Sequence, residues 1–185
     1  RTFAEYWAGR PGKMRTTLKR KAKKVDVDIL THFDETAWAA YKAIYSESWK
    51  PEEERADILE AFAAAEGAAG RIRLGIARAD GVPVAAQFWT VENGTAYIHK
   101  LAHIEAATPL SAGTTLSAAL FEYVIDTDGV ELVDFGTGSD AYKRDWMEQV
   151  RPRFRLTCLD WRQPRAWPAI AKAFVRHLAP HNRPS

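Results

Sequence analysis

The chain has 185 residues, of which 46% are hydrophobic, so it can bury one substantial core but hardly two full domains. Its formal net charge of +2 does not by itself indicate a nucleic-acid-binding protein. A single cysteine, Cys158, excludes an internal disulfide framework and a cysteine-rich zinc site, and it fits a reducing, cytoplasmic setting. No apolar run approaches the roughly 20 residues that a transmembrane helix needs.

Residues 1–25 are predicted to form a helical arm. Thr2 and Glu5 have the spacing of a capping box, and a second helix over 12–25 carries a narrow apolar stripe. The rest of that helix is basic, with Lys13, Arg15, Lys19, Arg20, Lys21, Lys23 and Lys24. This pattern is typical either of a solvated helix face or of a surface that docks polyanions. Because the chain starts at Arg1 without an initiator methionine, we expect it to be part of a longer protein.

Residues 26–179 are predicted to form the main domain, which opens with a strand over 25–30 because polar and apolar residues alternate there. Asp34 is expected to cap a helix running to about Trp49, and Pro51 to begin another helix. The inner face of the second helix is predicted to carry Ile58, Leu59 and Phe62. These helices are interpreted as core packing and as the wall on the substrate side.

A three-strand antiparallel meander follows. The predicted strands cover 71–79, 82–91 and 95–102. Asp80-Gly81 and Asn93-Gly94 supply the two-residue turns between them, since both dipeptides favour positive φ.

The central part of the chain reads as strand, helix, strand: 97–102, then Ser111 to about Asp126, then 131–135. Such a connection places the two strands parallel in one sheet. The predicted fold class is therefore a mixed α/β sheet, an antiparallel meander followed by a parallel strand–helix–strand unit. At the helix start, Gly113 permits close backbone approach, and Ser111, Thr114 and Thr115 add hydroxyls beside free N–H groups. This turn suits a phosphate, although a Ser/Thr helix start is also common in ordinary structure.

The segment from Asp134 to Trp146 has two glycines but lacks the third glycine of a dinucleotide fingerprint. We expect Ser139 or Asp140 to cap a short helix whose first turn carries Tyr142 and Lys143. Tyr142 can donate a proton to a departing thiolate, because the reference pKa of tyrosine exceeds that of a thiol. Lys143 can hold a phosphate or stabilise negative charge. Trp146 is expected to pack in the core.

Three titratable residues lie on or just after the strand before the helix: His99, His103 and Glu105. Each could accept a proton from an attacking amine or hydroxyl, or serve only a structural role. The four-residue spacing of the histidines predicts that both lie on one face of the strand. Without a third ligand they do not indicate a zinc site, and no metal is predicted.

After the central segment, 153–161 is predicted as a last strand with Cys158 a buried thiol in it. A closing helix is predicted over 166–178, with Trp167, Ile170, Phe174 and Leu178 inward, and a tail over 180–185.

Several of these blocks resemble the acyl-donor half of the GNAT acyltransferase superfamily. They are Val84-Ala-Ala-Gln-Phe88, the strand Thr95–Ala102, Ser111-Ala-Gly-Thr, and Asp134-Phe-Gly-x-Gly-x-x-x-Tyr142-Lys143-x-x-Trp146. The closest resemblance is to the branch associated with cellulose or exopolysaccharide biosynthesis, related to the peptidoglycan-bridge aminoacyltransferases. Members of that branch commonly have Ser-Pro-Gly where this chain has Ser111-Ala112-Gly113.

The resemblance implies an acetyl-CoA or acyl-CoA donor held between two parting strands. Backbone near Leu101 and Ala102 would polarise the thioester, Tyr142 would act as general acid, and the pyrophosphate would lie on the turn Leu110, Ser111, Ala112, Gly113, Thr114. Direct transfer to an amine or hydroxyl of a small molecule or saccharide would follow. It also implies that a GNAT-like half could precede this one. Transfer from a charged tRNA, which would employ the basic helix, and a non-catalytic CoA-binding module both remain alternatives.

Overall fold

The computed structural model describes residues 1–138 and 140–178, with side chains up to Val175. It divides into two compact units, Arg1–Glu148 and Gln149–Ser185, which are described separately here. The predicted domain boundaries at residues 25 and 179 stay predictions.

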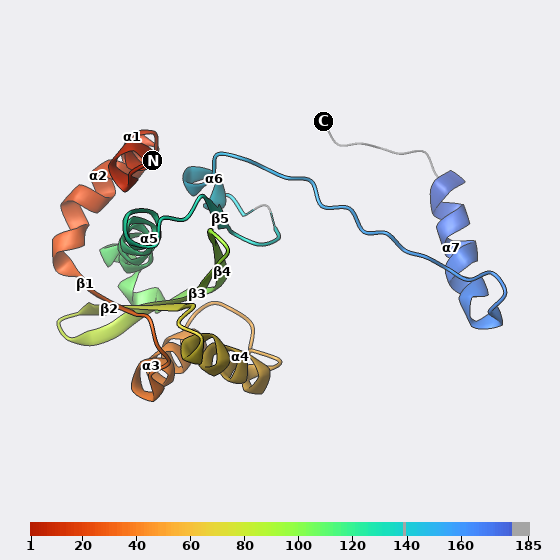
Figure 1. The fold of residues 1–185 in the computed structure, drawn as a ribbon, viewed down its shortest axis with the longest axis horizontal. Coiled ribbons are helices and arrows are strands. Elements are labelled where there is room, and N and C mark those ends of the chain that lie inside the picture. The colour runs from red at the N-terminus through yellow and green to blue at the C-terminus, as the bar shows by residue number, and fades with distance from the viewer. Residues whose placement is uncertain (139, 179–185) are drawn as a thin grey trace. The chain divides into compact units, whose positions relative to one another are not determined.

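The first unit is built on a five-stranded sheet with the order β1-β2-β3-β4-β5 (Figure 1). Its strands are β1 (Asp26–Leu30), β2 (Ile72–Ala79), β3 (Val82–Glu92), β4 (Thr95–His103) and β5 (Leu132–Asp134). The first four pair antiparallel, whereas β5 pairs parallel to β4. The predicted mixed α/β class is therefore confirmed.

Both predicted hairpin turns are present. Asp80 and Gly81 have φ of 50° and 79°, and Asn93 and Gly94 have φ of 49° and 71°. Two successive residues at positive φ match the right-handed twist of the flanking strands, which is why these dipeptides favour tight hairpins.

One face of the sheet is covered by α5 (Ala112–Glu122) together with α1 (Phe3–Ala8) and α2 (Gly12–Lys21). The predicted capping box of α1 is present, because Thr2 accepts from the Glu5 backbone and Glu5 accepts from the Thr2 backbone. Tyr6 of α1 stacks on Phe121 of α5 at 5.1 Å between centroids, and Phe121 stacks on Trp146 at 4.9 Å. The arm thus shares the core of this face, and Trp146 is buried in it as predicted.

The opposite face is covered by α3 (Glu35–Ser46) and α4 (Ala56–Ala68), which Figure 1 shows across the sheet from α5. Asp34 caps α3 as predicted, accepting from Ala37 N at 2.7 Å. The prediction for α4 was wrong about its start, which is Ala56 and not Pro51, and about part of its inner face, since Ile58 and Phe62 are 50% and 38% exposed. Its buried positions are Ala63 and Gly67. At Gly67 the helix lies so close to Phe33 that a Cβ would come within 2.5 Å of Phe33 N. Only small residues let α4 come this close.

A β-bulge in β4 changes which side chains face each layer. Phe88 of β3 pairs with Lys100 and Trp89 pairs with Ile98, so His99 is the extra residue. The His99 ring consequently packs against Phe62 and Phe88 on the α3/α4 side. His103 instead lies beside Gly113 at the start of α5. The prediction that both histidines share one face was wrong, because the bulge shifts the alternation by one residue.

Helix α5 continues into a π-helical turn, Tyr123–Thr127, after which the chain enters β5. A 3-10 helix, Glu105–Leu110, lies between β4 and α5, and another, Ala22–Lys24, lies between α2 and β1. After β5 the chain forms α6 (Lys143–Trp146).

The second unit contains a 3-10 turn, Pro164–Ala166, and α7 (Trp167–Leu178). The predicted strand over 153–161 is wrong: residues 151–160 have no regular structure, and Phe154 and Leu156 are 90% and 88% exposed. An alternating pattern forms a strand only where another strand supplies its hydrogen bonds, and the described part of this unit has none.

Two predictions about burial in this unit also fail. Cys158 is exposed, since it lies on this unpaired segment. The closing helix exists, but Trp167 and Phe174 are exposed, at 60% and 65%, and the side chain of Leu178 lies outside the described residues, as does the tail over 180–185. Among the helices that the structure describes, none combines the length and apolarity needed to cross a bilayer.

Candidate functional site

The site is organised by the separation of β4 from β5. The two strands pair only over Thr95–Tyr97 of β4 and Leu132–Asp134 of β5. Beyond Tyr97, β4 continues to His103 and pairs only with β3, so its other edge has no partner strand. The bulge at His99 falls in this part of β4. Within the described residues, Ile98–His103 therefore present backbone groups along one edge that no strand satisfies. Leu101 and Ala102, the residues predicted to face a thioester, lie in this stretch.

The first turn of α5 provides free amides at the end of β4. Thr115 N donates to Ser111 O at 3.0 Å. The N–H groups of residues 112, 113 and 114 have no acceptor among the residues that the structure describes. With the helix dipole behind them, they form a site suited to an anion.

Ser111 forms a left-handed junction at this turn, with φ 54° and ψ 37°. A non-glycine residue in this region costs about 1 kcal/mol, so the surrounding contacts must hold it there. Its hydroxyl makes no capping bond to the helix. Instead Ser111 Oγ lies 3.1 Å from Lys21 Nζ, which also donates to Pro109 O at 2.6 Å.

Lys21 was not singled out from the sequence, where it was one of seven basic residues on one helix. The structure places its ammonium at the start of α5, 90 residues away along the chain. The only sequence signal was the lack of nearby acids around that helix, which does not say which lysine reaches inward. This contact is the feature that joins the arm to the predicted phosphate turn.

Gln87 is a second residue without a predicted role, although it stands within Val84–Phe88. It is fully buried, and its amide nitrogen donates to Ser117 Oγ at 2.7 Å and to Gly113 O at 3.2 Å. Its oxygen accepts from Trp89 Nε1 at 2.9 Å. A glutamine with all three bonds inside a core fixes the first turns of α5 to β3. Thr115, also in this turn, is buried, and its Oγ1 has no hydrogen-bond partner in the described part of the chain.

His103 closes the other side of this turn. A Cβ at Gly113 would lie 3.5 Å from His103 Nδ1, and the Trp49 ring packs against the imidazole at a tilt of 50°, with 4.4 Å between centroids. The pKa of His103 is lowered, first by burial and further by Lys50, against an opposing effect of Glu105. The imidazole is therefore neutral and able to accept a proton near neutral pH. Glu105 itself is exposed at the start of the following 3-10 helix.

The turn after β5 carries Tyr142 and Lys143. Ser139 lies outside the described residues, and α6 has no side-chain cap, so the predicted cap by Asp140 is not formed. Tyr142 is half-exposed, and its pKa is raised by burial and by the nearby Asp140. The phenol therefore keeps its proton at any physiological pH.

Lys143 is buried, with Nζ 2.7 Å from Thr137 O, 3.3 Å from Phe135 O and 3.3 Å from Asp140 Oδ2. These contacts hold Phe135, Thr137 and Asp140 around the ammonium. Lys143 thus holds the backbone of the turn that carries Tyr142.

The predicted site residues fall into two groups in space. Residues 101–103 and 110–115 meet where β4 ends and α5 begins, together with Lys21 and Gln87. Tyr142 and Lys143 lie at the start of α6, which follows β5, the strand that parts from β4. His99 belongs to neither group, because it bonds Thr90 Oγ1 at 2.8 Å and packs among aromatic rings on the opposite face.

A mixed sheet whose fourth and fifth strands part beside a helix N-terminus is the α/β architecture of acyltransferase-type domains. The chain belongs to the Acetyltransferase (GNAT) domain family, whose pattern matches residues 12–144. The matched range includes both groups of site residues and Lys21. No curated protein sequence matches the chain.

Solved structures share this fold at low sequence identity. AAC(6')-Iy, solved in complex with the bisubstrate analogue CoA-S-monomethyl-acetylneamine, is 16% identical with a TM-score of 0.54, covering 72% of this chain and 99% of the other. An aminoglycoside acetyltransferase from an uncultured soil metagenomic sample, in complex with trehalose, is 16% identical with a TM-score of 0.53, covering 74% and 97%. The ribosomal-protein-S18-alanine N-acetyltransferase from Escherichia coli is 15% identical with a TM-score of 0.52, covering 66% and 74%. These likenesses establish the fold.

Proposed function

We propose that this GNAT domain transfers an acetyl or short acyl group from a CoA thioester to an amino group of a small molecule or saccharide. The observation that carries the proposal is the unpaired edge of β4, Ile98–His103, ending beside the free amides of α5. The residues present fit such a donor. An extended pantetheine arm carries amides that can pair with an open strand edge, and a diphosphate needs N–H groups and a cation.

At the diphosphate end, the amides of residues 112–114 and the ammonium of Lys21 are the groups we assign to phosphate oxygens. Lys21 Nζ lies 3.1 Å from Ser111 Oγ, close enough to share an anion with this turn. Gln87 and Ser117 hold the turn against β3, so the amides keep their direction without a ligand. Thr115 Oγ1, buried and lacking a partner within the described chain, gives the same turn one further hydrogen-bonding group.

The donor supplies an activated acyl carbon joined to a good leaving group. Backbone N–H on the Leu101–Ala102 edge is assigned to the carbonyl oxygen, where it would stabilise developing negative charge. As the acceptor nitrogen bonds to the acyl carbon and the C–S bond breaks, the Tyr142 hydroxyl gives its proton to the departing sulfur. His103, neutral because its pKa is lowered, is assigned to take the proton that the amine loses, with Glu105 as the alternative base.

Finer assignments remain proposals of the same kind. A role in bacterial-type polysaccharide biosynthesis and a cytoplasmic location rest on the resemblance and on the cysteine count, as does a preceding GNAT-like half. Transfer to a hydroxyl would use the same donor site. Transfer from aminoacyl-tRNA would use the exposed cations of α2, among them Lys13, Arg15, Lys19 and Arg20.

The proposal is tested by isothermal titration of the purified chain with acetyl-CoA, CoA and deacylated tRNA at two salt concentrations, followed by an assay that detects free thiol. We expect CoA and acetyl-CoA to bind and thiol to appear only with an amine acceptor. Tight tRNA binding with a steep salt dependence and no CoA binding would favour the tRNA-dependent alternative. If the chain binds CoA but transfers no acyl group to any amine or sugar, it is a non-catalytic CoA-binding module.

A further inference from the structure

The N-terminal arm contacts the end of the helix whose start carries Tyr142. Tyr6 Oη of α1 donates to the Trp146 carbonyl at 2.7 Å, and Nη1 of Arg10, which follows α1, donates to the same oxygen at 2.9 Å. Both bonds are buried, and they join residues 140 and 136 positions apart in the chain. Burial raises the pKa of Tyr6, so its hydroxyl remains a donor throughout the physiological range. Tyr6, Arg10 and this carbonyl are called the Trp146 clamp below.

Helix α6 depends on such contacts for its position. It is a single turn, Lys143–Trp146, closed by Met147 N donating to Lys143 O at 2.9 Å. A helix of one turn is not stable by itself, so the groups that bind its ends decide where it lies. Lys143 holds the N-terminal end, and the clamp holds the C-terminal end. Because Trp146 lies one helical turn after Tyr142, the placement of one determines the placement of the other.

The clamp is itself fixed to α5. The Tyr6 ring stacks on Phe121 of α5 with 5.1 Å between centroids and 4° between planes, and the Arg10 guanidinium lies 4.6 Å from the centre of the Tyr6 ring. Later in the same arm, Lys21 contacts Ser111 at the start of α5. The arm therefore contacts both groups of site residues and connects the turn of α6 to the proposed donor turn.

Arg10 is an unusual residue for the interior of this face. It is only 8% exposed, and its Nε has no hydrogen-bond partner in the described part of the chain. Its Nη2 pairs with Glu148 at 2.7 Å, a carboxylate that is 42% exposed and also binds Arg1. A buried charge with an unpaired N–H is unfavourable, and an apolar side chain of similar volume often gives an equally stable core. Packing alone thus does not require an arginine here, whereas holding the carbonyl at the end of α6 requires a donor.

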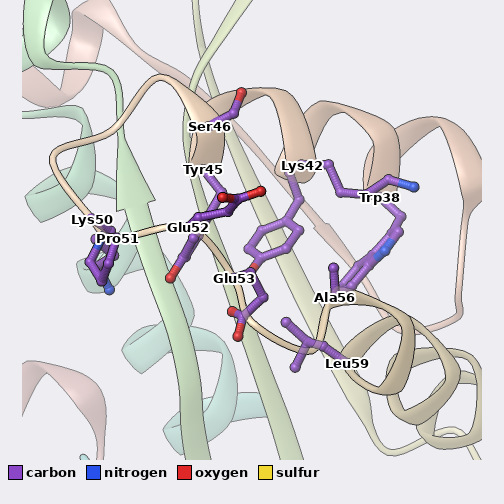
Figure 2. A pocket seen from close by; sticks show the side chains of 11 residues that line it. Trp38, Lys42, Tyr45, Ser46, Lys50, Pro51, Glu52, Glu53, Ala56 and Leu59 are labelled. Carbon is purple, nitrogen blue, oxygen red and sulfur yellow. The ribbon is translucent and has the colours of Figure 1, made fainter.

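The clamp is separate from the cavity on the other face of the sheet. Helix α3, the loop after it and the start of α4 enclose that cavity, which has a volume of about 460 Å³. Figure 2 shows Trp38, Ala56 and Leu59 toward one end of it and Lys50 and Pro51 toward the other. No residue of the clamp lines this cavity, so substitutions in the clamp leave its wall unchanged.

From these contacts we infer that Tyr6 and Arg10 are positioning residues for acyl transfer: by holding the Trp146 carbonyl they fix α6, and α6 places the Tyr142 hydroxyl where it reaches the departing sulfur. The inference rests on the proposed acyltransferase function and on the role of Tyr142 in it. Whether the clamp holds α6 does not depend on that function and can be measured without any reaction.

The variants Tyr6→Phe and Arg10→Met, made singly and together, test the clamp by the release of free thiol from acetyl-CoA. Each single variant leaves one donor on the Trp146 carbonyl, and Glu148 keeps its pair with Arg1. Only the double variant removes both donors, so we expect kcat to fall about threefold in each single variant and about 30-fold or more in the double variant. CoA affinity, measured by calorimetry, is expected to stay within about twofold of the parent because the donor turn is untouched.

A Tyr142→Phe background separates positioning from a merely structural role. With the Tyr142 hydroxyl already removed, the double substitution is expected to change the residual rate less than about twofold, because the group that the clamp positions is gone. Structural damage would instead lower the residual rate by the same factor as in the parent. An equal loss in both backgrounds, or a loss of kcat with an equal loss of CoA affinity, would overturn the inference.

Amide hydrogen exchange, followed by NMR, reports on α6 in the absence of substrates. In the double variant the amides of Asp145 and Met147, which bond within this turn, are expected to exchange about tenfold faster than in the parent. The amide of Thr115 in α5 is expected to exchange as in the parent. Unchanged exchange at Asp145 and Met147 would show that the clamp does not hold α6.

Arg1→Met is the matched control for Arg10→Met. Arg1 binds Glu148 through both of its terminal nitrogens but makes no bond to the Trp146 carbonyl. Its variant is therefore expected to change neither kcat nor the exchange of α6. If Arg1→Met matches the loss seen in Arg10→Met, the Glu148 ion pairs are responsible and the inference about the carbonyl is wrong.

The two proposals fail separately. A parent chain that binds CoA but transfers no acyl group would reject the transferase, and with it the catalytic role of the clamp, while faster exchange in the double variant would still show that the clamp holds α6. An active parent whose rate the double substitution leaves unchanged would keep the transferase and reject the positioning role of Tyr6 and Arg10.

Discussion

The two faces of the sheet build their sites in different ways. On the α5 face, the proposed donor turn consists of backbone amides whose direction is set by one left-handed residue and one buried glutamine, Ser111 and Gln87. On the α3/α4 face, the cavity consists of side chains from a helix, a loop and a second helix. Backbone sites depend on where a helix starts, whereas side-chain cavities depend on how several elements pack.

This difference has a functional consequence. A donor common to many acyltransferases can be held by backbone, which tolerates changes in side chains. An acceptor has to be distinguished by shape and by hydrogen-bonding pattern, and side chains vary both far more than backbone groups do. Substitutions on the two faces should therefore affect different steps, and the following variants test that separation.

The largest effect is expected for Tyr142→Phe, because it removes the proposed proton donor to the leaving sulfur. We expect kcat to fall about 100-fold or more with CoA affinity unchanged, as measured by steady-state kinetics and calorimetry. The pKa of Tyr142 is raised by burial and Asp140, so the acid form persists and the parent rate should not decline until the pH passes the ordinary range of a tyrosine. Full activity in this variant would exclude Tyr142 from the mechanism.

Gly113→Val should act on the donor turn alone. A Cβ at this position makes ordinary contact with His103 Nδ1, so Gly113→Ala is expected to be tolerated and serves as the matched control. The two methyl groups of valine extend further than this Cβ into the space beside the free amides, and we expect CoA affinity to fall about tenfold or more. Unchanged CoA binding, measured calorimetrically with Tm as a folding control, would contradict the assignment of this turn.

Lys21→Met tests whether the arm belongs to the donor site. Loss of one charge-assisted contact is expected to weaken CoA binding about fivefold to tenfold and to reduce its dependence on salt. Lys19→Met, an exposed position on the same helix, is the control and is expected to change neither. If both variants lose CoA affinity equally, the loss comes from the reduced net positive charge of the helix, and Lys21 has no specific role.

Much of the α5 face could be predicted from the sequence because its signals are local. Ser111 and Gly113 mark the start of α5, and in the sheet below it Asp80-Gly81 and Asn93-Gly94 fix the hairpins. The contribution of Lys21 could not be predicted, since it depends on a contact between residues 90 positions apart.

The misses have a common physical origin. The strand over 153–161 has the right alternation but no neighbour in its unit, and the bulge at His99 reverses a face that spacing alone would assign. The helices α3 and α4 were predicted only as core packing and as a wall, because no local pattern shows how α3, the loop after it and α4 leave a cavity among their side chains. In each case the decisive interaction lies outside the segment that carries the pattern.

The smallest expected effect concerns the contact between the two faces, where the rings of Trp49 and His103 pack against each other. Trp49→Ala removes part of the burial that lowers the pKa of His103, while Glu105, which raises it, and Lys50, which lowers it, stay in place. The pKa of His103 should therefore rise toward its ordinary value, as followed by NMR titration of the imidazole, and the acidic limb of the rate profile should move to higher pH with it. A variant whose His103 titrates as in the parent, yet whose activity falls, would show that Trp49 acts on the acceptor directly and not through the imidazole.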